Sequence, residues 1–275
     1  MISTTNALGF LRDKILDVLA LDLDDFGIAF VDEELVSNYL GLTLRSEFQE
    51  IRELSGNRVH GYEALLKVAD SEGRVDVSAA FQRAGEEGRL IPLDRVARTL
   101  HALNYRHAVP HGGLLFLKVH PRFLVSVTKH GRVFEKILHA YSIPTNRMVI
   151  ELQGVNVARE VELYEALMNY RERGYKVAID DSSLEYSSLE RLLGIAPEYV
   201  RLHSHLVHGA RKNGQLLRIF QGMVALIREL GAKSIIDGIE NEALLGIALE
   251  SGASLGQGAF LGEPHSARFL RSSQN

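Results

Sequence analysis

The chain of 275 residues contains no cysteine, which excludes a disulfide framework, thiolate catalysis and a thiolate metal site. It has no excess of basic residues either: the formal net charge is -4, so no positive field favours binding to bulk nucleic acid. No apolar run reaches the length of a membrane span, and Arg12, Asp13 and Lys14 interrupt the N-terminal segment where a signal peptide would be apolar. We therefore expect a soluble, cytoplasmic protein.

Hydrophobic residues make up 46% of the chain, which is enough for one large core, and the length suits a single α/β barrel. From residue 48 onward, short strand-like runs alternate with helical patterns, as is typical of α/β folds. Predicted strands cover residues 59–63, 114–119, 147–151, 199–202 and 254–257, and predicted helices cover residues 79–88, 93–105 and 133–141.

One helix-to-strand junction occurs twice, at residues 171–180 and 228–237. In both copies a helix stops at a glycine, Gly174 or Gly231, where a helix C-terminus favours a positive φ angle, and the strand then ends on an aspartate. Two αβ units therefore share one design. The apolar face of the first helix is predicted to contain Val157, Val161, Tyr164 and Met168, and that of the second Phe220, Met223, Ile227 and Leu230.

The N-terminal part differs from this α/β pattern. Apolar residues recur at helical spacing over residues 7–21, and a second short periodic stretch covers residues 34–40. We interpret residues 1–44 as an N-terminal helical extension, which precedes a barrel domain over residues 45–270 and a tail over residues 271–275. Isolated helices of this length rarely persist in water, so we expect the extension to pack on the barrel or on a partner.

An acidic segment between these two stretches partly matches a calcium-binding loop. Asp22, Asp24, Gly27 and Glu33 have the required spacing, but Phe26 stands where the loop needs an oxygen ligand. An acidic connector explains the segment better than a calcium site.

Carboxylates stand at the ends of several predicted strands: Glu63, Glu151, Asp180 and Asp237, with Asp181 beside them. In a (β/α)₈ barrel the strand ends meet on one face, so these side chains are expected to share a site. Such a cluster can bind hard divalent cations.

Two other patterns are weaker. His203, His205 and His208 invite a zinc hypothesis, but histidines at this spacing are more often packing or surface residues. The run Gly256-Gln257-Gly258 lacks the spacing of a dinucleotide fingerprint and the Lys-Ser/Thr of a P-loop.

The stretch Gly61-Tyr62-Glu63-Ala64-Leu65-Leu66-Lys67 resembles the signature of the EAL family, bacterial phosphodiesterases that hydrolyse cyclic di-GMP. The likeness extends over residues 48–264: Phe48-Gln49-Glu50-Ile51 is similar to the family's opening strand, and residues 81–94 to its first helix pair. It implies a TIM-like (β/α)₈ barrel of the EAL type. It also implies ligand-binding positions at Gln49, Glu63, Leu65, Lys67, Gln257 and Gly258, and metal-binding positions at Glu63, Glu151, Asp180 and Asp181.

Several residues depart from the family pattern where it carries catalysis. Lys118 replaces a metal-ligating asparagine, and an ammonium has no lone pair to give to Mg or Mn. It could act instead as a built-in cation for the carboxylates. Arg201 replaces the catalytic lysine, and Asp237 replaces the glutamate proposed as general base, which shortens the side chain by one methylene. The resemblance therefore assigns no intact catalytic residue.

Further departures lie around these positions. Gly154 replaces a glutamate, and residues 182–185 replace a glycine-containing loop that couples the metal site to a dimer interface. Lys67, in place of arginine, keeps a cation for a phosphate but loses its bidentate fork. Glu50, in place of proline, adds a negative charge near an anion site, and His203 replaces an aspartate.

Two functions remain open from the sequence. The favoured one is a catalytically inactive or strongly impaired EAL regulator of bacterial signalling, which binds cyclic di-GMP, a protein partner or both and needs no cofactor. The other is a slow Mg- or Mn-dependent phosphodiesterase that forms linear pGpG. EAL domains often dimerise, so a homodimer is also expected, although the altered loop and the extension bear on that interface.

Overall fold

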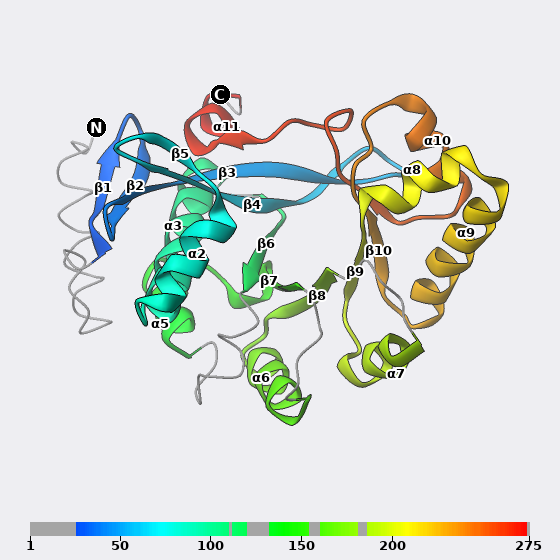
Figure 1. Ribbon diagram of the computed structural model, residues 1–275, viewed down its shortest axis with the longest axis horizontal. Coiled ribbons are helices and arrows are strands. Elements are labelled where there is room, and N and C mark those ends of the chain that lie inside the picture. Colours follow the sequence, from blue (N-terminus) through cyan, green and yellow to red (C-terminus); the bar gives the residue numbers. More distant parts are fainter. Residues whose placement is uncertain (1–25, 110–111, 120–131, 154–159, 181–185, 274–275) are drawn as a thin grey trace.

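The computed structural model describes residues 26–109, 112–119, 132–153, 160–180 and 186–273. Its central feature is a barrel (Figure 1), whose strands are β3 (Leu42–Glu53), β4 (Val59–Asp70), β6 (Leu114–Val119), β7 (Met148–Gln153), β8 (Lys176–Asp180), β9 (Tyr199–Leu202), β10 (Lys233–Ile236) and β11 (Leu255–Gly256). They pair in the order β3, β11, β10, β9, β8, β7, β6 and β4, and β4 pairs with β3 to close the ring. The predicted TIM-like barrel is confirmed.

The strand β3 is the exception to a parallel barrel. It runs antiparallel to β4 and to β11, whereas the other neighbouring strands are parallel. Beyond the barrel, β3 and β4 continue together as a long ribbon. This ribbon also carries β2 (Glu34–Tyr39) with β1 (Ile28–Val31), β5 (Gly73–Val75) and β12 (His265–Ser266).

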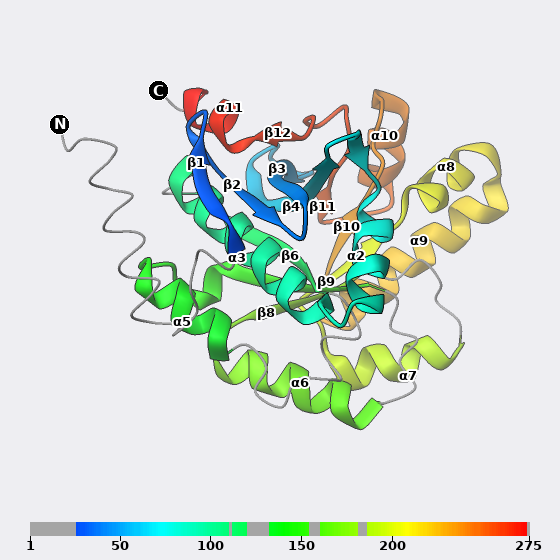
Figure 2. The ribbon, with the colours of Figure 1, turned by 60° about the vertical axis from the view of Figure 1, so that its left-hand side comes forward.

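Helices lie around the outside of the barrel (Figure 2). They are α5 (Arg132–Ala140), α6 (Glu160–Glu172), α7 (Tyr186–Ile195), α8 (Ser204–Lys212), α9 (Gly214–Glu229) and α10 (Glu242–Glu250), with a short 3₁₀ helix at Thr145–Arg147. Alongside the ribbon lie α2 (Val77–Glu86), α3 (Leu90–Ala108) and α11 (Ala267–Ser272). Within the described residues, no helix is both long and apolar enough to cross a membrane.

The predicted glycine stops are confirmed. Gly174 has a φ of +84° between α6 and β8, and Gly231 has a φ of +76° between α9 and β10. Only a residue without a Cβ adopts this conformation cheaply, so each helix ends where the next strand must turn back into the barrel. Asn241 caps α10, as its side chain accepts a hydrogen bond from the Leu244 amide at 3.1 Å.

The helical interpretation of residues 34–40 is wrong, because these residues form β2 and the following turn. Leu40 and Gly41 have φ angles of +54° and +71°, which suit a tight hairpin into β3. Asp32 and Glu33, at +50° and +68°, make the same kind of turn between β1 and β2. The predicted helix over residues 7–21, and Asp22 and Asp24 of the calcium pattern, lie outside the described residues.

The predicted apolar face of α6 is wrong for two of its residues, because Val161 and Met168 are 68% and 59% exposed, whereas Tyr164 packs against the core and Val157 lies outside the described residues. The helix buries mainly Leu163, Ala166, Leu167 and Tyr170. The helix carries apolar residues on two sides, so periodicity alone selects the wrong one. The face predicted for α9 is better supported, since Phe220 and Ile227 are buried in the core between the helices and the barrel.

The contact between α3 and β3 contains a buried histidine. The Nδ1 atom of His101 lies 2.8 Å from the Ser46 hydroxyl, and its ring meets that of Phe48 edge-on. Burial lowers the pKa of His101 to about 3, so the folded protein keeps this imidazole neutral.

This histidine predicts a stability loss in weak acid. Below about pH 6.5 the unfolded chain takes up a proton at His101 that the folded chain refuses until about pH 3, so stability falls as the pH drops, by up to ~1.4 kcal/mol per pH unit. In urea titrations from pH 7 to pH 5, the wild type is expected to lose more stability than His101→Gln. Parallel pH curves for the two proteins would contradict a neutral buried histidine.

Candidate functional site

The site residues are placed by the alternation of side chains along the barrel strands. One interior layer is apolar, and it consists of Ile51, Phe116, Val149, Ala178, Tyr199, Ile235 and Leu255. Side chains return to the same face every second residue, so the next interior layer lies two positions further along each parallel strand. That layer contains Glu63, Lys118, Glu151, Asp180, Arg201, Asp237 and Gln257, and antiparallel β3 adds Gln49, two residues before Ile51.

Glu63 is held on both carboxylate oxygens. Its Oε1 lies 2.8 Å from Lys118 Nζ, and its Oε2 accepts a hydrogen bond from Gln257 Nε2 at 2.7 Å. The same Gln257 nitrogen also donates to Gln49 Oε1 at 3.0 Å, and Gln49 donates to the Gly262 carbonyl at 3.0 Å. Two of the expected ligand-binding residues, Gln49 and Gln257, therefore fix the position of Glu63.

Glu63 does not end a strand, as the sequence suggested. Its strand, β4, continues to Asp70 along β3, and the pairing with β6 stops at Glu63. The residue therefore marks the place where β4 leaves the barrel. Apolar alternation locates this position but gives no sign that the strand continues beyond it.

Arg201 lies at the centre of the cluster and is only 2% exposed. Its Nε donates to Glu151 Oε1 at 2.6 Å, its second terminal nitrogen lies 3.6 Å from Glu63 Oε2, and its first donates to Gln257 Oε1. One guanidinium thus joins β4, β7, β9 and β11. Although burial opposes its charge, Glu151 and Glu63 raise the pKa of Arg201 above its usual range.

The two glutamates differ in their ionisation. Burial would raise the pKa of Glu63, but Arg201 and Lys118 bring it down to about 2. Burial and the charge of Glu63 raise the pKa of Glu151 to about 7, against the attraction of Arg201. Glu151 Oε2 has no hydrogen-bond partner among the described residues, so only one oxygen of this buried carboxyl group is paired, with Arg201.

Two aspartates complete the described cluster. Asp180 Oδ1 lies 2.8 Å from His203 Nε2, and the His203 ring stacks on that of His205. Asp237 is half-buried after β10, and it accepts a hydrogen bond from the Gly238 amide at 2.7 Å. The described residues contain no group of His, Asp or Glu side chains arranged to hold a metal ion. The zinc hypothesis for His203, His205 and His208 therefore has no support in the structure.

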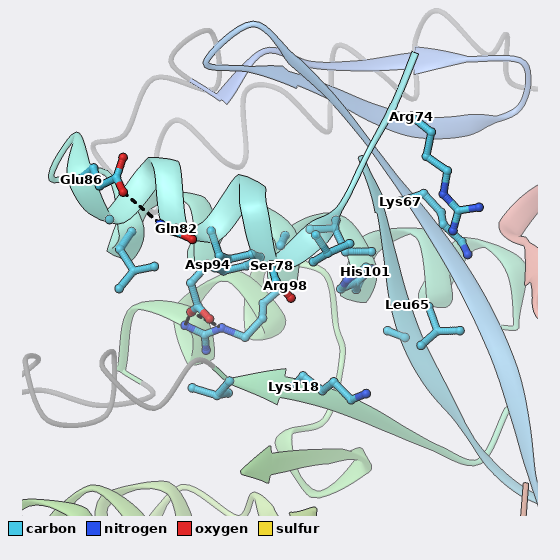
Figure 3. Close-up of a pocket in the computed structure, with 18 residues that line it drawn as sticks. Leu65, Lys67, Arg74, Ser78, Gln82, Glu86, Asp94, Arg98, His101 and Lys118 are labelled. Carbon is cyan, nitrogen blue, oxygen red and sulfur yellow. Dashed lines mark hydrogen bonds and ion pairs between the residues drawn. The ribbon is translucent and has the colours of Figure 1, made fainter. Parts of the chain in front are cut away.

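A cleft of about 1110 Å³ lies beside this cluster, between β4, α2 and α3 (Figure 3). Lys118 belongs to both the cluster and the cleft wall. The expected ligand-binding residues Leu65 and Lys67 line the cleft on β4, and Lys67 Nζ lies 3.0 Å from Glu47. Gly258 lies elsewhere, against the backbone of Ile239, at a φ of +149°.

Three cleft residues were not expected from the sequence. Arg74, on β5, is exposed and has no ion-pair partner among the described residues. It lies on the same side of the ribbon as Lys67, because it pairs with Ala69, two residues further along β4. Asp94 and Arg98 form a buried ion pair on α3 with an Nε-to-Oδ2 distance of 2.8 Å, and their spacing of four residues is the one signal that could have revealed it.

A family model described as the EAL domain matches residues 36–264, most of the chain. The chain belongs to the EAL family. The match begins within β2, inside the segment that we had assigned to the extension.

Relatives within the EAL family support this assignment. The uncharacterized EAL-domain containing protein YkuI of Bacillus subtilis is 28% identical over 224 residues, which cover 79% of this chain and 54% of that protein. The cyclic di-GMP phosphodiesterase RocR of Pseudomonas aeruginosa is 24% identical over 151 residues, or 54% of this chain and 38% of that protein. This chain thus spans about half or less of these relatives.

Solved structures show the same fold. A PaMucR phosphodiesterase in complex with c-di-GMP has a TM-score of 0.74 at 19% identity, covering 82% of this chain and 94% of that chain. A c-di-GMP-bound form of a standalone EAL protein from Vibrio cholerae O395 has a TM-score of 0.70 at 19% identity, covering 82% of this chain and 93% of that chain.

The EAL resemblance implies a Mg or Mn site on Glu63, Glu151, Asp180 and Asp181. Of the three that the structure describes, each carboxylate already lies within 2.8 Å of a nitrogen of Lys118, Arg201 or His203. A divalent ion would have to displace these groups or accept two positive charges beside it. The described residues therefore do not fit the metal. Asp181, Gly154 and residues 182–185 lie outside the described part.

Removing Arg201 is expected to destabilise the barrel strongly. Arg201→Met leaves the buried Glu63 and Glu151 without their shared cation, and breaking a buried pair in this way costs about 3–5 kcal/mol. Arg201→Lys keeps the charge and should cost less. Urea unfolding of both variants at pH 7 measures the difference, and a loss below ~1 kcal/mol for Arg201→Met would contradict the central role of this residue.

Proposed function

We propose that this chain is a non-catalytic EAL-family regulator that binds cyclic di-GMP, with docking on a protein partner as a second output. The observation that carries the proposal is the pairing of Glu63 and Glu151 with Lys118 and Arg201, at 2.8 and 2.6 Å. A hydrolytic site needs these carboxylates to hold a metal that lowers the pKa of an attacking water. An ammonium and a guanidinium supply charge but no coordination site for that water.

The cleft supports cyclic di-GMP as the ligand. Its volume of about 1110 Å³ is slightly above the usual range for small-molecule sites, which suits a ligand as large as a cyclic dinucleotide. Lys67, Arg74 and Lys118 supply positive charge for two phosphates, and Leu65 and Phe81 offer apolar surface to a base. RocR is named a cyclic di-GMP phosphodiesterase, and the PaMucR structure contains c-di-GMP.

The sequence suggested that the negative charge of Glu50 would count against an anionic ligand, but this carboxylate is paired with a cation. Its Oε2 accepts a hydrogen bond from Arg52 Nε at 2.7 Å, so a neighbouring cation offsets its negative charge. The protein partner and a homodimer stay predictions from the sequence.

A slow Mg- or Mn-dependent phosphodiesterase that forms linear pGpG is the alternative. It is favoured by one observation: Glu151 and Asp180 remain on neighbouring parallel strands, β7 and β8, and Glu63 is two strands from Glu151. In that case Asp237 would serve as a displaced base.

Binding and hydrolysis can be measured on one sample. We expect saturable cyclic di-GMP binding by calorimetry, without hydrolysis above that of Glu63→Ala in millimolar magnesium or manganese. Steady formation of pGpG by the wild type alone would establish the slow phosphodiesterase. Absence of both binding and hydrolysis would leave protein docking as the function and would refute the nucleotide ligand.

Arg74 tests whether the cleft holds the ligand. Arg74→Ala is expected to weaken cyclic di-GMP binding about tenfold, because it removes a charge-assisted contact to phosphate. Arg218→Ala, on exposed α9 across the molecule, serves as a matched control and should bind as the wild type does. Equal affinities for all three proteins would place the ligand outside this cleft.

A further inference from the structure

Lys118 lies at the boundary between the buried carboxylates and the open cleft. Its Nζ is 2.8 Å from Glu63 Oε1, while 37% of its side chain is exposed and lines the cleft. Arg201, the other cation of the cluster, is only 2% exposed beneath it. Among the described residues of the cluster, Lys118 is therefore the cation that a ligand in the cleft can reach.

The surroundings of Lys118 hold its ammonium in place. Its Nζ lies 2.8 Å from Oε1 of the buried Glu63, so the lysine is paired with a carboxylate of the cluster. Glu63 is in turn held by Gln257 and Arg201 on its other oxygen, so it cannot easily swing away from the lysine. The position of the Lys118 ammonium is thus fixed by the protein itself, without a ligand.

An ammonium has three N–H donors, and the contact with Glu63 uses one of them. The remaining donors can bind phosphate oxygens at the cleft end of the cluster. Lys67 is paired in the same way, with its ammonium 3.0 Å from Glu47, but it lies on the ribbon beyond the barrel and not beside Glu63. Two arginines also line the cleft: Arg98, which is buried and paired with Asp94, and Arg74, which is exposed on β5 at the ribbon.

We propose that the Lys118 ammonium binds a phosphate of cyclic di-GMP directly and replaces the divalent cation between that phosphate and Glu63, so that binding needs no metal. This inference rests on the proposed function. The presence of lysine at position 118, in place of the family's asparagine, therefore has two effects. The same positive charge that excludes a metal from Glu63 supplies the attraction for the ligand, and it cannot activate a water for hydrolysis.

The test is a calorimetric titration of the full chain with cyclic di-GMP, in EDTA and in millimolar magnesium or manganese. The wild type is expected to bind with the same affinity, within about twofold, in all three solutions. Lys118→Met should bind about tenfold more weakly or worse, because a charge-assisted hydrogen bond is lost. Lys118→Arg, which keeps a cation at this position, should recover part of the affinity.

Lys233→Met is the matched control, because Lys233 is exposed at the start of β10, at the opposite end of the strand from Asp237. Thermal unfolding shows whether each variant is folded. If Lys118→Met does not fold, the affinities of the wild type with and without metal still test whether binding needs a metal. Wild-type binding that appears only with metal would overturn the phosphate anchor alone, as would an unchanged affinity in folded Lys118→Met. No binding in any solution would overturn the proposed function and the anchor with it.

Discussion

The site depends on the burial of Arg201 between Glu63 and Glu151, two carboxylates from other strands of the barrel. A guanidinium that is 2% exposed needs its charge balanced, and Glu63 and Glu151 balance it from β4 and β7, while Gln257, just after β11, accepts one of its hydrogen bonds. Each of these groups is therefore fixed by the others. The arrangement of the barrel end follows from this one cation, and a ligand meets a site whose charges are already paired.

Much of this arrangement is encoded in simple patterns. Strands that alternate with helices indicate a barrel, and the shared glycine stop and terminal aspartate place Asp180 and Asp237 at equivalent points. Because side chains alternate along a strand, the position two residues after each apolar interior residue must face inward. Strand ends therefore predicted that Glu151, Asp180 and Asp237 would share one end of the barrel, whereas the position of Lys118 beside Glu63 was expected only from the family resemblance.

Other features depend on contacts that no local pattern shows. The hairpin before β3 uses a positive φ angle at Leu40, a residue type that rarely marks such a turn, so β2 was mistaken for a helix. The apolar side of α6 could not be chosen because the helix has two such sides. The cleft is lined by Arg74 on β5 and by Arg98 on α3, which come to share it only when the ribbon packs against that helix. Tertiary packing decides all three.

In this EAL barrel, Lys118 and Arg201 pair with Glu63 and Glu151, the carboxylates at which the family resemblance implies a metal. This charge balance is the basis of the proposal that the chain binds its ligand without turnover. The anomalous signal of a crystal grown in manganese tests it most directly. We expect no peak between Glu63 and Glu151, with Lys118 still in contact with Glu63. A manganese peak that Glu63 and Glu151 share, with Lys118 displaced, would contradict it.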